Sequence, residues 1–317
     1  MQALLSLACF SLTAHADTLD YAFNTIPNGA SGNFQAWGIG NNGTIVGNLY
    51  TGYGVYGATY SEGAVTSIPG YMQYAFDINS GGTVVGTNAY NGSKGYMRDS
   101  AGQTTFFDVT LPGAIQGTTW GSGINNSGQV VGFYTSNHYQ GYLRNVDGSF
   151  VNISVPDATY TQARGINDSG YVVGNYSVAL NDAYASVRAY GFVRAPNGTF
   201  TTLSGPNAIA GLGTYVTDIN NNGDVLGWYY ANQAGYSGAA VPFVYRDGKY
   251  FTVDLPSTMQ GPSVQFTGLN DSRSFVGTAN GGSFVAVLAP VPEPKTYAMM
   301  MAGLGLLGFM AKRKKSA

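Results

Sequence analysis

The segment GINNSGQVVG at residues 123–132 is one of six similar ten-residue segments in this chain of 317 residues. In each segment an aliphatic residue ends one apolar run, a polar stretch rich in Asn, Asp, Ser and Gly follows, and a second apolar run begins. This pattern is typical of a β-hairpin, because Asn, Asp and Gly tolerate the backbone conformations of tight turns. The other five segments are GIGNNGTIVG (38–47), DINSGGTVVG (77–86), GINDSGYVVG (165–174), DINNNGDVLG (218–227) and GLNDSRSFVG (268–277).

A second recurring unit follows each of the first five hairpins. It reads GYMR at 95–98, GYLR at 141–144 and GFVR at 191–194, with looser versions at 57–60 and 242–246. Each version precedes a short polar turn, after which an apolar run ends at a proline. A repeat therefore contains four strands within about 40–50 residues, which is the size of one β-propeller blade.

The two ends of the repeat region together supply the four strands of one blade. The sixth repeat ends with its third strand at 283–288, whereas residues 21–27, before the first repeat, resemble a fourth strand without a blade. We therefore predict an all-β, six-bladed propeller of four-stranded blades over residues 17–289, whose last blade is closed by the N-terminal strand. Closure removes the exposed strand edges that invite aggregation. A β-solenoid is the structural alternative, but its periods are usually shorter and it needs no strand from the far end.

The composition narrows the function classes. Charged residues make up 9% of the chain, against about 25% in an ordinary soluble domain, which disfavours helical bundles, coiled coils and charged disordered tails. Cys9 and His15 lie in a segment expected to be removed, so thiol chemistry is excluded and a histidine-based site would rest on His138 alone. Five of the 14 basic residues lie at 295 and 312–315, which leaves nine against 16 acidic residues in the body. We expect no nucleic-acid partner.

Residues 1–16 are predicted to be a signal peptide. An apolar stretch at 3–12 precedes Ala14-His15-Ala16, which is an A-x-A site where a signal peptidase would cut before Asp17. An N-terminal core strand is the alternative. That alternative is disfavoured because the segment precedes the repeats and fits none of them.

The C-terminal residues 290–317 form a second terminal signal. Val-Pro-Glu-Pro at 291–294 leads into an uncharged stretch at 297–311, and a basic cluster follows at 312–315. As a helix the uncharged stretch would cover about 22 Å, and flanking Lys and Tyr residues could extend its reach to the membrane surfaces. The positive-inside rule keeps the basic cluster cytoplasmic and the body outside the inner membrane. A buried core helix is the alternative, and it would leave that basic cluster without acidic partners.

These three parts, in this order at the end of the chain, resemble the PEP-CTERM sorting signal of Gram-negative bacteria. The resemblance implies recognition by an exosortase, removal of the tail during export, transient anchoring in the inner membrane, and a source that makes extracellular polysaccharide and biofilm. It implies that Pro292, Glu293 and Pro294 are recognition residues and that Lys312, Arg313, Lys314 and Lys315 form the cytoplasmic anchor. The I-N-x-x-G-x-V-V-G half of the repeat also resembles extracellular HAF-type repeats, although the His-Ala-Phe of that family is absent here.

Tyrosines gather in the connections predicted for one face of the ring. In a four-stranded meander, the loops between second and third strands share a face with the loops between blades, and both kinds are long and aromatic here. Tyrosine can stack on sugar rings and bond their hydroxyl groups, although such rings can equally pack between blades. The expected ligand face comprises Tyr53, Tyr56, Tyr134, His138, Tyr139, Tyr184, Tyr190, Tyr229, Tyr230 and Tyr236, and the loops between blades add Tyr71, Tyr74, Trp120 and Tyr160.

No catalytic, metal or cofactor site is expected. The polar turns lack the alternating oxygen ligands and late glutamate of a calcium loop. Paired carboxylates for glycoside hydrolysis are not evident, although Asp108, Asp157 and Asp254 are loose candidates. The arginines beside the turns between third and fourth strands are expected to bond local carbonyl groups on the opposite face. These arginines are Arg98, Arg144, Arg194 and Arg246.

Together these features predict an exported, non-catalytic protein of the cell surface or biofilm matrix. Its Tyr-rich face would bind extracellular polysaccharide or another surface protein. One alternative is a polysaccharide lyase or hydrolase acting on the same face. The other is a structural surface component that has no ligand.

Overall fold

The computed structural model describes residues 18–70, 72–90, 92–178, 188–206, 208, 213–233, 236–259 and 264–289. The predicted signal peptide, the whole C-terminal signal with its expected transmembrane helix, and Tyr184 lie outside these residues. Tyr236 is described as part of a strand, but its side chain is not. Within the described ranges, no helix has the length and apolar character needed to cross a membrane.

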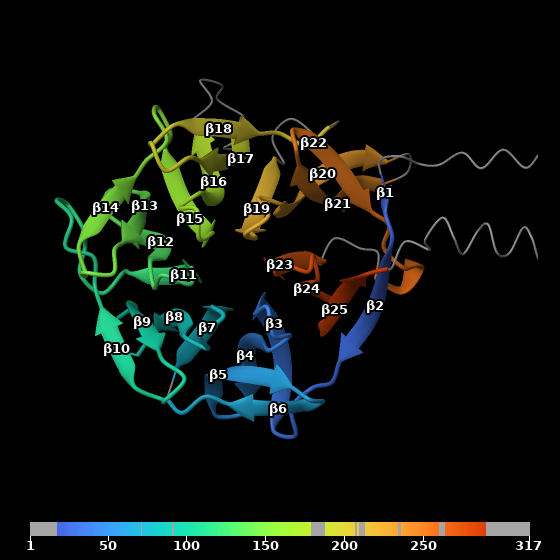
Figure 1. Ribbon diagram of the computed structural model, residues 1–317, viewed down its shortest axis with the longest axis horizontal. Coiled ribbons are helices and arrows are strands. Elements are labelled where there is room, and N and C mark those ends of the chain that lie inside the picture. The colour runs from blue at the N-terminus through green and yellow to red at the C-terminus, as the bar shows by residue number, and fades with distance from the viewer. Residues whose placement is uncertain are drawn as a thin grey trace, which may run out of the picture.

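Six antiparallel sheets stand around a central channel like the blades of a propeller (Figure 1), which confirms the predicted fold. The first strand of each repeat lies innermost, and the later strands follow outward in chain order. Blade 1 contains β3 (Gly32–Ile39), β4 (Ile45–Thr51), β5 (Gly54–Ser61) and β6 (Ala64–Ser67); blade 2 contains β7 (Gln73–Ile78), β8 (Val84–Asn88), β9 (Lys94–Arg98) and β10 (Thr104–Phe107); blade 3 contains β11 (Trp120–Ile124), β12 (Val130–Thr135), β13 (Tyr139–Arg144) and β14 (Phe150–Ile153). Blade 4 contains β15 (Tyr160–Ile166), β16 (Val172–Val178), β17 (Arg188–Arg194) and β18 (Phe200–Leu203); blade 5 contains β19 (Thr214–Ile219), β20 (Val225–Gln233), β21 (Tyr236–Arg246) and β22 (Lys249–Val253); blade 6 contains β23 (Gln265–Leu269), β24 (Phe275–Ala279) and β25 (Gly282–Leu288). A short 3-10 helix, η1 (Ser257–Met259), follows blade 5.

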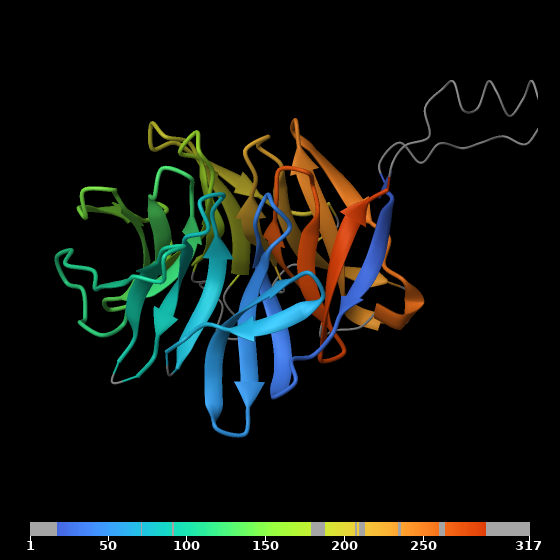
Figure 2. The same ribbon diagram turned by 60° about the horizontal axis from the view of Figure 1, so that its bottom comes forward.

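The N-terminal strand closes the ring, as the repeat count predicts. Strand β2 (Tyr21–Ile26) pairs antiparallel with β25, from Tyr21 opposite Leu288 to Ile26 opposite Ser283. The preceding strand β1 (Thr18–Leu19) pairs parallel with β22, which makes blade 5 five-stranded, and the sequence analysis missed this pairing. The first described residues therefore bridge blades 5 and 6, and Figure 2 shows β2 lying along the outside of β25.

Apolar side chains fill the spaces between blades. The first residue of each Val-Val-Gly-type segment (valine, isoleucine or, in the sixth repeat, Phe275) and the residue after it are buried, and Val85, Val131 and Val173 have no exposed surface. The glycine that follows them lies against the inner strand of its own blade. At Gly132 an added Cβ atom would stand only 1.8 Å from the Trp120 carbonyl oxygen, so no larger residue fits without moving the backbone.

The recurring asparagine of the hairpin segment ties the blades together. Its side-chain amide donates a hydrogen bond to the backbone carbonyl at the same position of the next blade, as from Asn125 to Asn167 (3.2 Å) and from Asn167 to Asn220 (3.2 Å). The same bond joins Asn79 to Asn125, Asn220 to Asn270 and Asn270 to Gly40. In blades 2 to 6 the asparagine therefore belongs to the turn and also bonds its blade to the next, whereas blade 1 has Gly40 at this position.

A β-bulge interrupts every inner strand at the same place. The pairing register shifts between residues 36 and 38 in β3, and between 75 and 77, 121 and 123, 163 and 165, 216 and 218, and 266 and 268 in the other five. A bulge leaves one residue unpaired and redirects its side chain. These six residues, one per blade, line the central channel: Trp37, Phe76, Ser122, Arg164, Thr217 and Thr267.

Candidate ligand site in the central channel

The central channel has two different ends. We call the face formed by the turns between first and second strands the hairpin face, and the opposite face the loop face. At the hairpin face the channel narrows to a polar cavity of about 50 Å³. Toward the loop face it widens to about 500 Å³, a size that holds small ligands, and we call this space the wide cavity.

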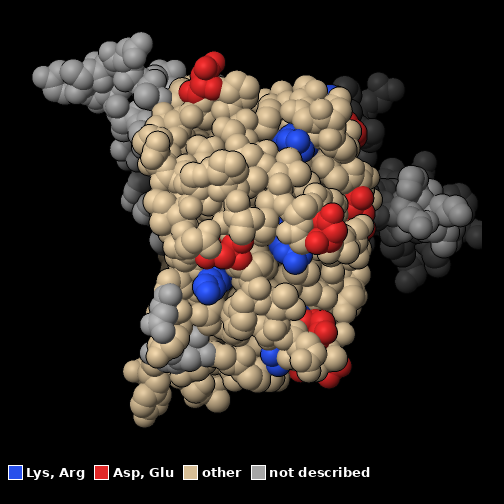
Figure 3. All heavy atoms as spheres, turned by 90° about the vertical axis from the view of Figure 1, so that its left-hand side faces the viewer, with Lys and Arg blue, Asp and Glu red and all other residues tan. Residues whose placement is uncertain are grey.

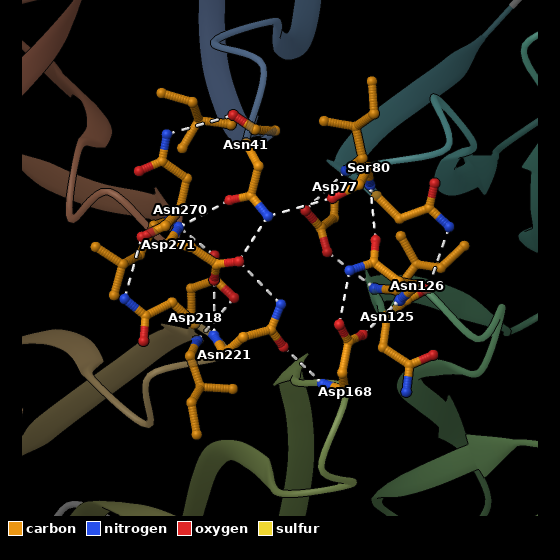
Figure 4. Close-up of a pocket in the computed structure, with 18 of the residues that line it drawn as sticks. Asn41, Asp77, Ser80, Asn125, Asn126, Asp168, Asp218, Asn221, Asn270 and Asp271 are labelled. Carbon is orange, nitrogen blue, oxygen red and sulfur yellow. Dashed lines mark hydrogen bonds between the residues drawn. The ribbon is translucent and has the colours of Figure 1, made fainter.

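Figure 4 shows how polar side chains fill the narrow end. A closed ring of hydrogen bonds runs from blade to blade through the second turn residue of each hairpin: Asn41, Ser80, Asn126, Asp168, Asn221 and Asp271. For example, Asn126 Nδ2 donates to Asp168 Oδ2 at 2.7 Å, and Asn41 Nδ2 donates to Asp271 Oδ2 at 2.7 Å. The side chains bond one another and leave water-sized space, so this end fastens the ring and has no room for an organic ligand.

Two aspartates lie just inside that polar ring, and of these Asp218 is buried and Asp77 is partly buried. Asp77 accepts hydrogen bonds from the backbone N–H groups of Ile78 (2.7 Å) and Ile124 (2.9 Å), and Asp218 bonds Ile219 (2.8 Å) and Leu269 (2.7 Å) in the same way. Burial raises the pKa of the Asp77 carboxyl to about 7, against the opposing effect of these bonds. Burial, and then the charge of Asp77, raise the pKa of Asp218. Each carboxylate thus bonds the backbone of its own blade and that of the next blade. The described residues contain no cluster of three metal-ligating residues.

Aromatic rings form most of the wall of the wide cavity. Trp120 stacks on Phe133 with ring centroids 5.7 Å apart, and Phe76 contacts both Trp120 (6.1 Å) and Trp37 (5.1 Å). On the other side Tyr215 stacks on Trp228 at 5.4 Å. All three tryptophans of the chain line this cavity. Such walls offer flat apolar faces to a ring-shaped ligand.

Arg164 is the charged residue of this cavity among the described residues. Its guanidinium lies 5.2 Å from the centre of the Phe133 ring and donates a hydrogen bond from Nη2 to Gln162 Oε1 at 2.8 Å. Desolvation lowers the pKa of the Arg164 guanidinium to about 10. No carboxylate of the described residues lies within 4 Å of it, since the only ion pairs there are those of Asp224 with Arg246 and Arg273.

A side pocket of about 570 Å³ opens next to the wide cavity. It is lined by His138 from the loop between β12 and β13, by Tyr139 at the start of β13, and by Tyr160 and Gln162 from β15. The two spaces share Arg164, Asn175 and Tyr215 as lining residues, so the guanidinium borders both.

The structure places the predicted tyrosines in different environments. His138 and Tyr139 line the side pocket, and Tyr139 is 45% exposed. Tyr53 is 88% exposed at the turn between β4 and β5, and lies outside the cavity lining. Tyr56 lies in β5, Tyr190 stacks on Tyr176, and Tyr230 contacts Tyr215 edge-on.

Two of the proposed ligand residues are buried, which corrects their assignment to an exposed face. Tyr134 is 3% exposed and packs in the core shared with Val130 and Tyr142. Tyr229 is 5% exposed and packs against Phe243, with ring centroids 6.1 Å apart. Both lie in a second strand at positions that face the space between blades, so their rings stabilise the fold.

Sequence reasoning missed most of the cavity wall because it searched loops. The bulged residue always stands two positions before the aliphatic anchor, as Trp37 does before Ile39 and Arg164 before Ile166. The six repeats place five different residue types at that inward-facing position, and this variation within a regular repeat is the signal that could have found them. Tyr74 and Trp120, which the sequence analysis assigned to loops, stand in or at the start of inner strands and also line the cavity.

The other candidate charges have local partners. Arg144 donates to the Asn145 carbonyl oxygen at 3.3 Å, as expected, whereas Arg98 bonds the Thr104 hydroxyl at 3.0 Å. Arg194 lies over Phe200, and Arg246 lies over Phe251 and 4.0 Å from Asp224. Asp108 accepts from Gly117 N at 2.7 Å and from the Thr119 hydroxyl, which orders the loop after blade 2. The side of the ring shown in Figure 3 carries scattered charges of both signs, with no continuous basic patch.

Comparison with known proteins identifies the C-terminal signal. Residues 290–314 match the family model of the PEP-CTERM protein-sorting motif, which confirms the resemblance found in the sequence. The motif implies export, processing by an exosortase and delivery to the cell surface. None of the curated proteins matches the sequence of this chain.

Solved structures resemble the propeller at low sequence identity. A gluconolactonase from Xanthomonas campestris superposes with a TM-score of 0.55 at 13% identity, over 87% of this chain and 93% of its own. A proposed gluconolactonase gives 0.51 at 11%, over 86% and 94%. A streptogramin B lyase gives 0.49 at 11%, over 85% and 98%. At these identities the likeness concerns the fold alone.

Proposed function

We propose that this exported protein binds an extracellular polysaccharide in the wide cavity and does so without catalysis, as a component of the cell surface or biofilm matrix. The observation that carries the proposal is the aromatic wall, which surrounds about 500 Å³ of space and opens toward the loop face. Stacked rings on a rigid scaffold suit the apolar faces of sugar rings. We also propose that the repeats are of the extracellular HAF type, in agreement with export.

Binding is tested on the full chain in mild detergent against an array of bacterial and plant glycans. Trp120 stacks on Phe133 in the cavity wall, so Trp120→Ala is expected to weaken binding by about tenfold or more. Tyr53→Ala is the matched control, because this exposed aromatic residue lies outside the cavity lining, and it should bind as the original protein does. An equal loss of binding in both variants would contradict the proposal. Failure of the original protein to bind any glycan would also contradict it, and would favour a structural component without a ligand.

Catalysis and sorting are tested separately. Incubation with each bound polysaccharide should release neither reducing ends nor unsaturated products; their appearance would favour the lyase or hydrolase alternative.

Removal of residues 291–317 should change the location and mass of the mature protein, because it removes the matched sorting motif. Identical fractionation of both forms would contradict sorting by this signal.

A further inference from the structure

Among the described residues that line the candidate site, Arg164 carries the one fixed charge. The described residues that line the wide cavity and the side pocket include no aspartate or glutamate, and Arg164 belongs to both linings. Its described polar contact is with the neutral Gln162 amide. Arg164 is partly buried, and a partly buried guanidinium without a counter-charge among the described residues is unfavourable, so a ligand that supplies the counter-charge gains affinity from it.

Other polar groups in the same wall are also unpaired donors. Asn48 is 1% exposed, and its Nδ2 has no hydrogen-bond partner within the described part of the protein, whereas its Oδ1 accepts from Ala75 N at 2.9 Å. The Trp37 Nε1 is buried and unpaired as well. The equivalent Asn175 in blade 4 differs, because its amide bonds both the N–H and the carbonyl of Val216 (2.7 and 2.9 Å).

From this donor excess, and resting on the proposed function, we propose that the ligand is an acidic polysaccharide whose uronate-type carboxylate pairs with Arg164. The guanidinium presents two parallel N–H donors, and this fork matches the two oxygens of a carboxylate. The sugar ring that carries the carboxylate stacks on the aromatic wall. A neutral glycan makes the stacking contacts but leaves the guanidinium without a counter-charge.

The test compares ligands that differ in charge but not in length. The full chain in mild detergent is titrated with hexagalacturonate and with cellohexaose, at low and at high salt. Three variants are compared with the original protein. Arg164→Gln removes the charge, Arg164→Lys keeps the charge without the fork, and Arg98→Gln removes a matched charge that bonds Thr104 beside the opposite face.

The original protein and the Arg98→Gln variant are expected to bind the acidic hexamer about 10- to 100-fold more tightly than the neutral one, with an affinity that falls as salt rises. Arg164→Gln should abolish the preference for the acidic hexamer while keeping the weaker binding of neutral glycans. Arg164→Lys should retain part of that preference. Neutral binding also reports that the variant is folded.

Two results would overturn the proposal in different ways. Equal affinity for both hexamers, or an unchanged preference in Arg164→Gln, would contradict the acidic ligand and leave polysaccharide binding in place. Failure of every glycan, acidic or neutral, on the array and in the titration would contradict the proposed function itself.

Discussion

Raising the pH from about 5 to about 8 is expected to destabilise the folded protein, because Asp77 is partly buried and Asp218 is buried beside the channel axis. The pKa of Asp77 rises from an ordinary value of 3.8 to about 7 in the folded state. Between these values the folded chain binds more protons than the unfolded chain. The contribution of Asp77 to stability is therefore greatest below about pH 4, falls as the pH rises, and levels off above about pH 7.

The size of the effect follows from the pKa difference. Each pKa unit corresponds to about 1.4 kcal/mol, so ionised Asp77 costs the fold at most about 4 kcal/mol relative to the protonated form. This is an upper bound, since the carboxyl borders the small polar cavity at the narrow end. Asp218, whose pKa is also raised, adds to the loss in the same direction.

The assay is urea denaturation of the full chain in mild detergent, followed by tryptophan fluorescence across this pH range. Asp77→Asn is expected to lower stability at pH 5 by about 1–2 kcal/mol, since an amide accepts only one of the two backbone N–H bonds. It should also reduce the pH slope, and a second change of Asp218→Asn should remove it. Asp99→Asn, at an exposed turn, is the control and should leave the slope unchanged. A flat or rising stability profile in the original protein would refute the reasoning, as would an unchanged slope in the double variant.

Two further changes test how the ring is held together. Asn167→Ala removes the bond to the Asn220 carbonyl and a bond within its own turn, so thermal or urea denaturation should show a loss of about 2–4 kcal/mol. Asn197→Ala, at an exposed outer turn, should cost about 1 kcal/mol or less, and equal losses would contradict the role of the inner asparagine. Gly132→Ala would force a Cβ atom to within 1.8 Å of the Trp120 carbonyl oxygen, so we expect little soluble folded protein; normal yield and stability would contradict that crowding.

The repeat pattern was enough to predict the architecture because it indicates both where the turns lie and which residues are buried. The asparagine and glycine of 123–132 are required by hairpin geometry, and the missing fourth strand of the last repeat pointed to the N-terminal residues that supply it. The parallel pairing of Thr18 and Leu19 with blade 5 carried no such signal, since two residues hold no periodicity.

The site was harder to predict because the sequence does not say which face of an inner strand borders the channel. Regular alternation puts the bulged residue on the same face as the residue two positions before it, as in Tyr74 and Phe76 or Trp120 and Ser122, but nothing in the sequence marks that face as the wall of a cavity. Searching the loops selected His138 and Tyr139, which line the side pocket, but it could not separate them from Tyr134 and Tyr229, which fill the core.

The three tryptophans allow the central claim to be tested without a label, because all of them line the wide cavity. A glycan that the array shows to bind is titrated into the full chain while intrinsic tryptophan emission and heat of binding are recorded together. Occupation of the wide cavity predicts a saturable emission change with the same midpoint as the heat. A clear heat of binding with unchanged tryptophan emission would place the ligand elsewhere on the molecule and contradict the account.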